Sequence, residues 1–121
     1  MTLDAAGRAQ RARGQDLLDR LAEPYRHEED LGRSTMFGST GLNHLGSIVG
    51  FVGLEGQLVV KLDPAGLRDV RTAGPTVPVH IGRGIAKAWI GLPFGGDPDT
   101  ARRWSEALAA GVSAARASVT A

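Results

Sequence analysis

The segment Gly82-Arg83-Gly84 is the part of the chain that comes nearest to a phosphate-binding loop. Glycine-rich loops bind phosphate through their backbone amides when further glycines and a following helix complete the motif. Here the third glycine and the helix are both missing, and no Gly-x-x-x-x-Gly-Lys-Ser/Thr motif occurs in the chain. We therefore favour a connection between two strands, with Arg83 facing solvent, over a phosphate contact.

Metal binding and nucleophilic catalysis find no support in the residue spacing. His27, His44 and His80 lie in separate segments without the close spacing of metal ligands, and the chain contains no cysteine. No Gly-x-Ser-x-Gly motif presents a nucleophile, and Ser39 is expected in a turn, where its hydroxyl bonds the local backbone. The acidic residues 28–30 are expected to form a solvated loop. We expect no catalytic residue, no metal and no organic cofactor.

The charge balance indicates the kind of partner. The 121 residues include 14 basic and 13 acidic side chains, which leaves a net charge of +1 and no basic stripe for nucleic acid. Direct nucleic-acid binding is therefore not expected. No apolar run approaches the roughly 20 residues that a membrane span requires, and no secretion signal is evident at the N-terminus, so a cytoplasmic protein without membrane contact is predicted.

Helix signals occur in three places. Leu17, Leu18 and Leu21 have helical spacing, and the pairs Asp63-Pro64 and Asp97-Pro98 each place a capping carboxylate before a proline. Gly74 is expected to end the second helix in a left-handed conformation. The predicted helices are Ala5–Ala22, Asp63–Ala73 and Asp97–Ala117.

Between these helices, short apolar segments alternate with some of the 17 glycines, a pattern typical of antiparallel strands. Leu54-Glu55-Gly56-Gln57 predicts a two-residue hairpin turn with positive φ at Gly56. The predicted strands are Met36-Phe37, Gly41–Leu45, Ser47–Leu54, Gln57–Leu62, Thr76–Ile81 and Lys87–Leu92.

The segregated order of these elements predicts one α+β domain over residues 1–121, with an antiparallel sheet of five or six strands flanked by helices. The predicted order is α-β-β-β-(β)-α-β-β-α. Residues 1–5 and 117–121 are expected to be flexible. The core is expected to include Trp89 and Trp104 together with Phe51, Leu58, Val60 and Leu108.

From Arg33 onward the chain resembles the TfoX/Sxy N-terminal domain family. Met36-Phe37-Gly38-Ser39-Thr40-Gly41-Leu42 is similar to the family's opening strand and turn, and Leu58-Val59-Val60-Lys61-Leu62 to its next strand motif. The resemblance continues through Ala73-Gly74, Gly82-Arg83, Lys87-Ala88-Trp89-Ile90, Trp104 and Ala107-Leu108. The chain departs from the family's pattern at Ser39, at His44-Leu45-Gly46 and at Thr72.

The resemblance implies an α+β domain similar to secretion-chaperone-like folds, without established catalytic residues or cofactor. Better-known members carry a second, helical domain and regulate natural competence alongside a transcription activator. We therefore expect a non-enzymatic module that contacts a protein partner such as a transcription regulator. The alternative is a small-molecule-binding or enzymatic domain with a pocket between the sheet and the last helix. The residues expected to contact a partner are Met36, Phe37, Arg83, Lys87 and Trp89.

A homodimer is also predicted. An open antiparallel sheet leaves strand edges with unpaired amides and carbonyls, and the Met36–Leu62 strands carry few charges that would discourage pairing. The alternative is a monomer whose edge is shielded by the first helix or by the chain ends.

Overall fold

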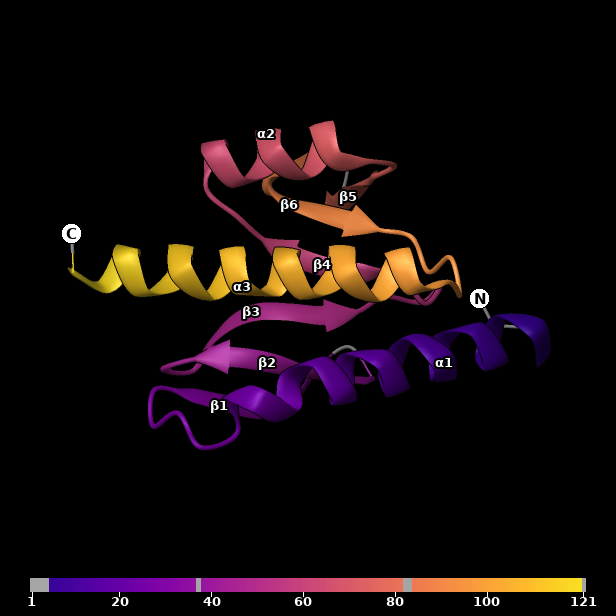
Figure 1. Ribbon diagram of the computed structural model, residues 1–121, viewed down its shortest axis with the longest axis horizontal. Coiled ribbons are helices and arrows are strands. Elements are labelled where there is room, and N and C mark those ends of the chain that lie inside the picture. Colours follow the sequence, from indigo (N-terminus) through magenta and orange to yellow (C-terminus); the bar gives the residue numbers. More distant parts are fainter. Residues whose placement is uncertain (1–4, 37, 82–83, 121) are drawn as a thin grey trace.

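The computed structural model describes residues 5–36, 38–81 and 84–120 and contains one six-stranded antiparallel sheet with three helices (Figure 1). The strand order in the sheet is β1-β2-β3-β4-β6-β5. The predicted α+β fold and its element order are confirmed. The elements are α1 (Ala5–Ala22), a 3-10 turn (Glu23–Tyr25), β1 (Leu31–Met36), β2 (Ser39–His44), β3 (Ser47–Val52), β4 (Leu58–Lys61), α2 (Pro64–Ala73), β5 (Val77–Ile81), β6 (Gly84–Leu92) and α3 (Pro98–Thr120).

Local capping explains where α2 and α3 begin. Asp63 Oδ1 accepts a hydrogen bond from the amide of Gly66 at 2.7 Å, and Asp97 Oδ1 accepts one from the amide of Thr100 at 2.8 Å. Both predicted caps are therefore confirmed. α3 continues to Thr120, beyond the predicted end at Ala117, whereas residues 1–4 and 121 of the predicted flexible ends lie outside the described residues.

The end of α2 differs from the prediction. Gly74 has φ 164° and ψ −166°, which is extended backbone and not the left-handed conformation. Arg103 of α3 occupies this place instead: its Nη1 donates to Pro75 O at 2.8 Å and its Nη2 to Val70 O at 3.3 Å. A β-carbon at residue 74 would lie 2.9 Å from Cζ of Arg103. Glycine is therefore required here for space, because an arginine satisfies the carbonyls at the helix end.

The start of the sheet also differs. The first strand was predicted at Met36-Phe37, whereas β1 begins at Leu31 and Phe37 lies outside the described residues. Ser39 begins β2 and is buried, so its assignment to a turn is wrong. Its hydroxyl donates to Oε1 of Gln15 at 2.7 Å and accepts from the amide of Val52 at 3.1 Å, which links α1 to the sheet.

The β3–β4 hairpin is confirmed, with a longer turn. The amide of Gly53 donates to the carbonyl of Gln57 at 2.9 Å, so three residues form the loop instead of two. Gly56 has the expected positive φ, 84°. A glycine in the left-handed conformation is the usual third residue of such a loop.

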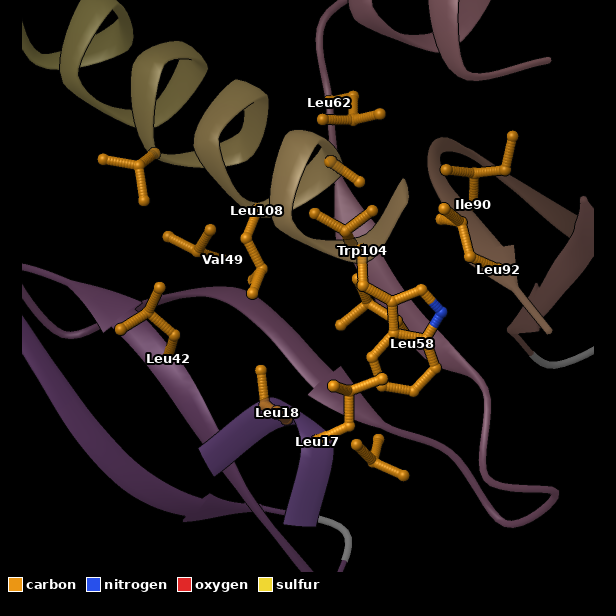
Figure 2. Packing of buried hydrophobic residues seen from close by; sticks show 14 of the residues in the cluster. Leu17, Leu18, Leu42, Val49, Leu58, Leu62, Ile90, Leu92, Trp104 and Leu108 are labelled. Atoms are coloured by element: carbon orange, nitrogen blue, oxygen red, sulfur yellow. The ribbon is translucent and has the colours of Figure 1, made fainter. Parts of the chain in front are cut away.

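All three helices lie on the same face of the sheet (Figure 1), where α3 contacts α1, α2, β2, β3 and β4. Trp104 and Leu108 of α3 are fully buried against Leu58 and Val60 of β4, and Figure 2 shows the Trp104 ring among Leu17, Leu58 and Leu92. In the described part of the chain no helix packs on the opposite face. No described helix has the length and apolar composition to cross a membrane.

Candidate functional site

The face of the sheet opposite the helices carries a row of apolar and basic side chains. Val60 of β4 and Ile90 of β6 are paired and belong to the core. Because side chains alternate along a strand, their neighbours point to the other face. The surface formed by Phe51, Val59, Lys61, Val77, Lys87, Trp89 and Gly91 is called the open face below.

Aromatic rings lie at the centre of the open face. Phe51 and Trp89 are half-buried, and their ring centroids are 6.1 Å apart with an interplanar angle of 62°. The prediction that both belong to one core with Trp104 is therefore wrong. Trp89 is directly opposite Lys61 in the register of β4 and β6, so its position within the strand turns it away from α3.

The charged side chains of the open face are both positive. Lys61 and Lys87 are the two lysines of the chain, and both are exposed. None of the six described strands contains an aspartate or a glutamate. Lysine side chains beside aromatic rings, without a carboxylate in the strands, give this face a positive potential over an apolar base.

The five residues predicted to contact a partner fall in different places. The structure brings Lys87 and Trp89 together on the open face, whereas Met36 ends β1 at the other edge of the sheet. Phe37 and Arg83 lie outside the described residues. Sequence reasoning missed Phe51, Val59, Lys61 and Val77, although the placement of Lys61 between Val60 and Leu62 was a signal that one side of this strand faces solvent.

On the helix-covered side, a groove of about 400 Å³ runs between the C-terminal half of α3 and strands β2, β3 and β4. Its polar members include His44 and Ser47, and its walls are mainly apolar. The residues that line it are His44, Leu45, Ser47, Ile48, Val49, Lys61, Leu62, Asp63, Gly111, Ala114, Ala115, Ser118 and Val119.

An ionic network adjoins this groove. Arg116 of α3 donates from Nε and Nη2 to the two carboxylate oxygens of Asp30, each at 2.8 Å, and from Nη2 to Glu28 at 3.2 Å. Nε2 of the buried His44 lies 3.1 Å from Asp30 Oδ2. The hydrogen bonds from Arg116 are the main reason why the pKa of Asp30 falls to about 2. The same contacts raise the pKa of Arg116. The network thus fixes the loop before β1 to α3.

The candidate metal ligands are dispersed. His27 and His80 are exposed and lie in segments distant from His44 in the sequence. Within residues 5–36, 38–81 and 84–120 no three His, Cys, Asp or Glu side chains form a group that could hold a metal ion.

Comparison of the chain with models of protein families, with curated proteins and with solved structures finds no match.

Proposed function

We propose that the protein is a non-enzymatic interaction module that binds a protein partner on the open face. One observation carries this proposal: two aromatic rings and two lysines share a sheet face that no described helix covers. A partly exposed apolar surface, here the rims of Phe51 and Trp89 around the buried Val59, is typical of a docking site. Val77, which is 37% exposed at the β5 edge, extends the apolar surface across the sheet.

The positive charge of the open face favours an acidic partner. Two copies meeting face to face would gather four lysines in one interface with no strand carboxylate to balance them, which is unfavourable. A protein with acidic groups around an apolar centre complements Lys61, Lys87 and the rings of Phe51 and Trp89. The family resemblance implies that this partner is a regulator of transcription, for which the module would act as an adaptor; that role is part of the proposal.

Site-specific photocrosslinking in the native cells tests the proposal. A benzoyl-phenylalanine at Val77 is expected to form an adduct with one protein whose surface is acidic, identified by mass spectrometry. The double reversal Lys61→Glu and Lys87→Glu should abolish the adduct. The matched control, Arg13→Glu with Arg20→Glu, makes the same charge change at exposed positions of α1 and should leave it intact.

Three results would contradict the proposal. The adduct could form equally from a probe at Ala109, an exposed position of α3. It could survive the lysine reversals, or it could be degraded by nuclease, which would make nucleic acid the partner of the open face. Saturable turnover of a metabolite by the purified chain would favour the enzymatic alternative.

A further inference from the structure

The mouth of the groove beneath α3 is unusually apolar for a surface. Leu45 is 64% exposed and Val119 is 60% exposed, and both line the groove. Ile48, Val49 and Ala115 continue the apolar wall inward. The groove volume of about 400 Å³ lies within the range of small-molecule sites, about 300–1,000 Å³.

Leu45 has an unfavourable backbone conformation at this mouth. Its φ is +50°, and it is the one non-glycine residue with positive φ among residues 5–36, 38–81 and 84–120. It forms the tight β2–β3 turn with Gly46, and its amide donates to the carbonyl of Asp30 at 3.0 Å. The left-handed conformation is unfavourable for leucine and is adopted more readily by asparagine or glycine. A strained, exposed leucine beside a groove indicates a binding role for its side chain.

His44 supplies the polar contact inside the groove. Its Nε2 faces the carboxylate of Asp30, which places the proton of a neutral ring on Nε2 and leaves Nδ1 as an acceptor. Nδ1 has no protein partner among the described residues. Among the described side chains, Nε of Arg103 is the one polar atom that has neither solvent contact nor a hydrogen-bond partner. Because Nδ1 of His44 also has no partner, it must retain contact with solvent.

We propose that this groove binds a small, neutral, mainly apolar molecule with a hydroxyl or N–H donor. The donor bonds Nδ1 of His44, and the apolar body lies between Ile48 and Ala115 with Leu45 at the mouth. The carboxylate of Asp63 caps α2 and the side chain of Lys61 belongs to the open face, so neither charge is directed into the groove, which favours a neutral ligand over an ion. This site lies on the helix-covered side of the sheet and does not depend on the proposed partner at the open face.

Phenol and anisole form a matched pair of probes, because methylation of the oxygen removes the donor and keeps the ring. Titrations followed by the imidazole ¹⁵N–¹H NMR signals are expected to show a saturable shift of His44 with phenol. The exposed His27 and His80 serve as internal controls and should not shift. Anisole and benzoate should bind at least tenfold more weakly than phenol.

Two variants locate the site. Ala114→Leu fills the groove from α3, and Ser118→Phe, at an exposed position, closes it without disturbing the core. Each should abolish the His44 shift, whereas Ala109→Leu, outside the groove, should preserve it. Amide spectra show whether the variants remain folded. If Ala114→Leu does not fold, the test depends on Ser118→Phe. Equal binding of anisole, equal shifts of all three histidines, or unchanged binding in the folded variants would overturn the proposal.

Discussion

The backbone of α1 at Gly14 lies so close to the β3–β4 turn that a β-carbon there would stand 2.4 Å from the carbonyl oxygen of Gly56. Gly56 is restricted in return, because a β-carbon on it would lie 2.7 Å from the carbonyl oxygen of Gln10. A hydrogen bond from Gln10 Nε2 to the carbonyl of Glu55, 3.0 Å long, fixes the same contact. Two glycines thus allow α1 to lie directly on the turn.

Gly14→Ala should therefore destabilise the protein. Helix propensity alone favours alanine by about 1 kcal/mol, but displacing a backbone oxygen costs typically 1–3 kcal/mol, so we expect a net loss of about 1 kcal/mol. Urea unfolding measures it. Ala12→Gly, at an exposed position of α1, is the control for propensity and should cost about 1 kcal/mol. A gain of stability in Gly14→Ala would show that the close contact does not exist.

Signals contained within a few residues predicted the helices well. α1 has the predicted bounds, and the Asp-Pro pairs before α2 and α3 mark their starts because the cap lies next to the helix that it begins. β1 was mostly missed because Leu31–Thr35 has no alternation of apolar and polar residues; it is stabilised by pairing with β2. The ion pair of Arg33 with Asp19, 2.7 Å, also joins segments that are separate in sequence.

The candidate site was predicted only in part, for a related reason. In β6, Trp89 points to one side of the strand, and Ile90 and Leu92 point to the other. Both sides are therefore apolar in the sequence. Which side meets α3 depends on pairing with β4, where Val60 faces Ile90 and Lys61 faces Trp89. The link between His44 and Arg116, which runs through Asp30, could not be predicted from sequence, because Arg116 and Asp30 are 86 residues apart and their contact depends on where α3 crosses the sheet.

The two tryptophans should respond differently to substitution. Trp104 is fully buried, stacks edge-on against Phe94 at 6.0 Å, and donates from Nε1 to the carbonyl of Pro93 at 3.3 Å. Trp104→Ala should lower the free energy of unfolding by about 3–5 kcal/mol. Trp89→Ala removes a half-buried ring from the open face and should cost about 1 kcal/mol.

Chemical denaturation of both variants measures this difference. The adduct predicted at Val77 should be lost in Trp89→Ala while the protein remains folded, which separates a binding role from a structural one. An equal loss of stability in the two variants would mean that Trp89 belongs to a closed core.

The network around Asp30 predicts a pH dependence of stability. The pKa of Asp30 is about 2 in the folded protein and 3.8 ordinarily, so the folded state favours the ionised carboxylate. This stabilisation is complete above about pH 4 and is lost as the pH falls towards 2. Asp30→Asn should lower stability at neutral pH and flatten the stability profile between pH 4 and 2.

Urea unfolding at a series of pH values checks this expectation. Asp16→Asn, an exposed position on α1, is the matched control and should follow the wild-type profile. A profile of Asp30→Asn parallel to that of the wild type would show that the contact with Arg116 contributes nothing to the pH dependence.

Self-association is predicted through a strand edge. The sequence placed the unprotected edge among residues 36–62, but β2, β3 and β4 are interior, and the edge strands are β1 and β5. β5 carries Pro78, which lacks an amide donor, and its pairing with β6 is irregular between Pro78 and His80. β1 contains no proline and one charge, Arg33, which is engaged by Asp19. β1 is therefore the edge that a second copy would extend.

We expect a symmetric dimer formed by antiparallel pairing of two β1 strands, since closed two-fold assemblies are the commonest. Sedimentation equilibrium at micromolar concentration should then give a mass that rises with concentration above the 12.7 kDa of one chain. Thr35→Lys places a charge at an exposed position of this edge and should shift the equilibrium to the monomer, because lysines on edge strands oppose pairing. The matched change at the other edge, His80→Lys, should leave the dimer unchanged. A mass of one chain at every concentration would rule out the dimer, and equal effects of the two lysines would assign it to a surface other than β1.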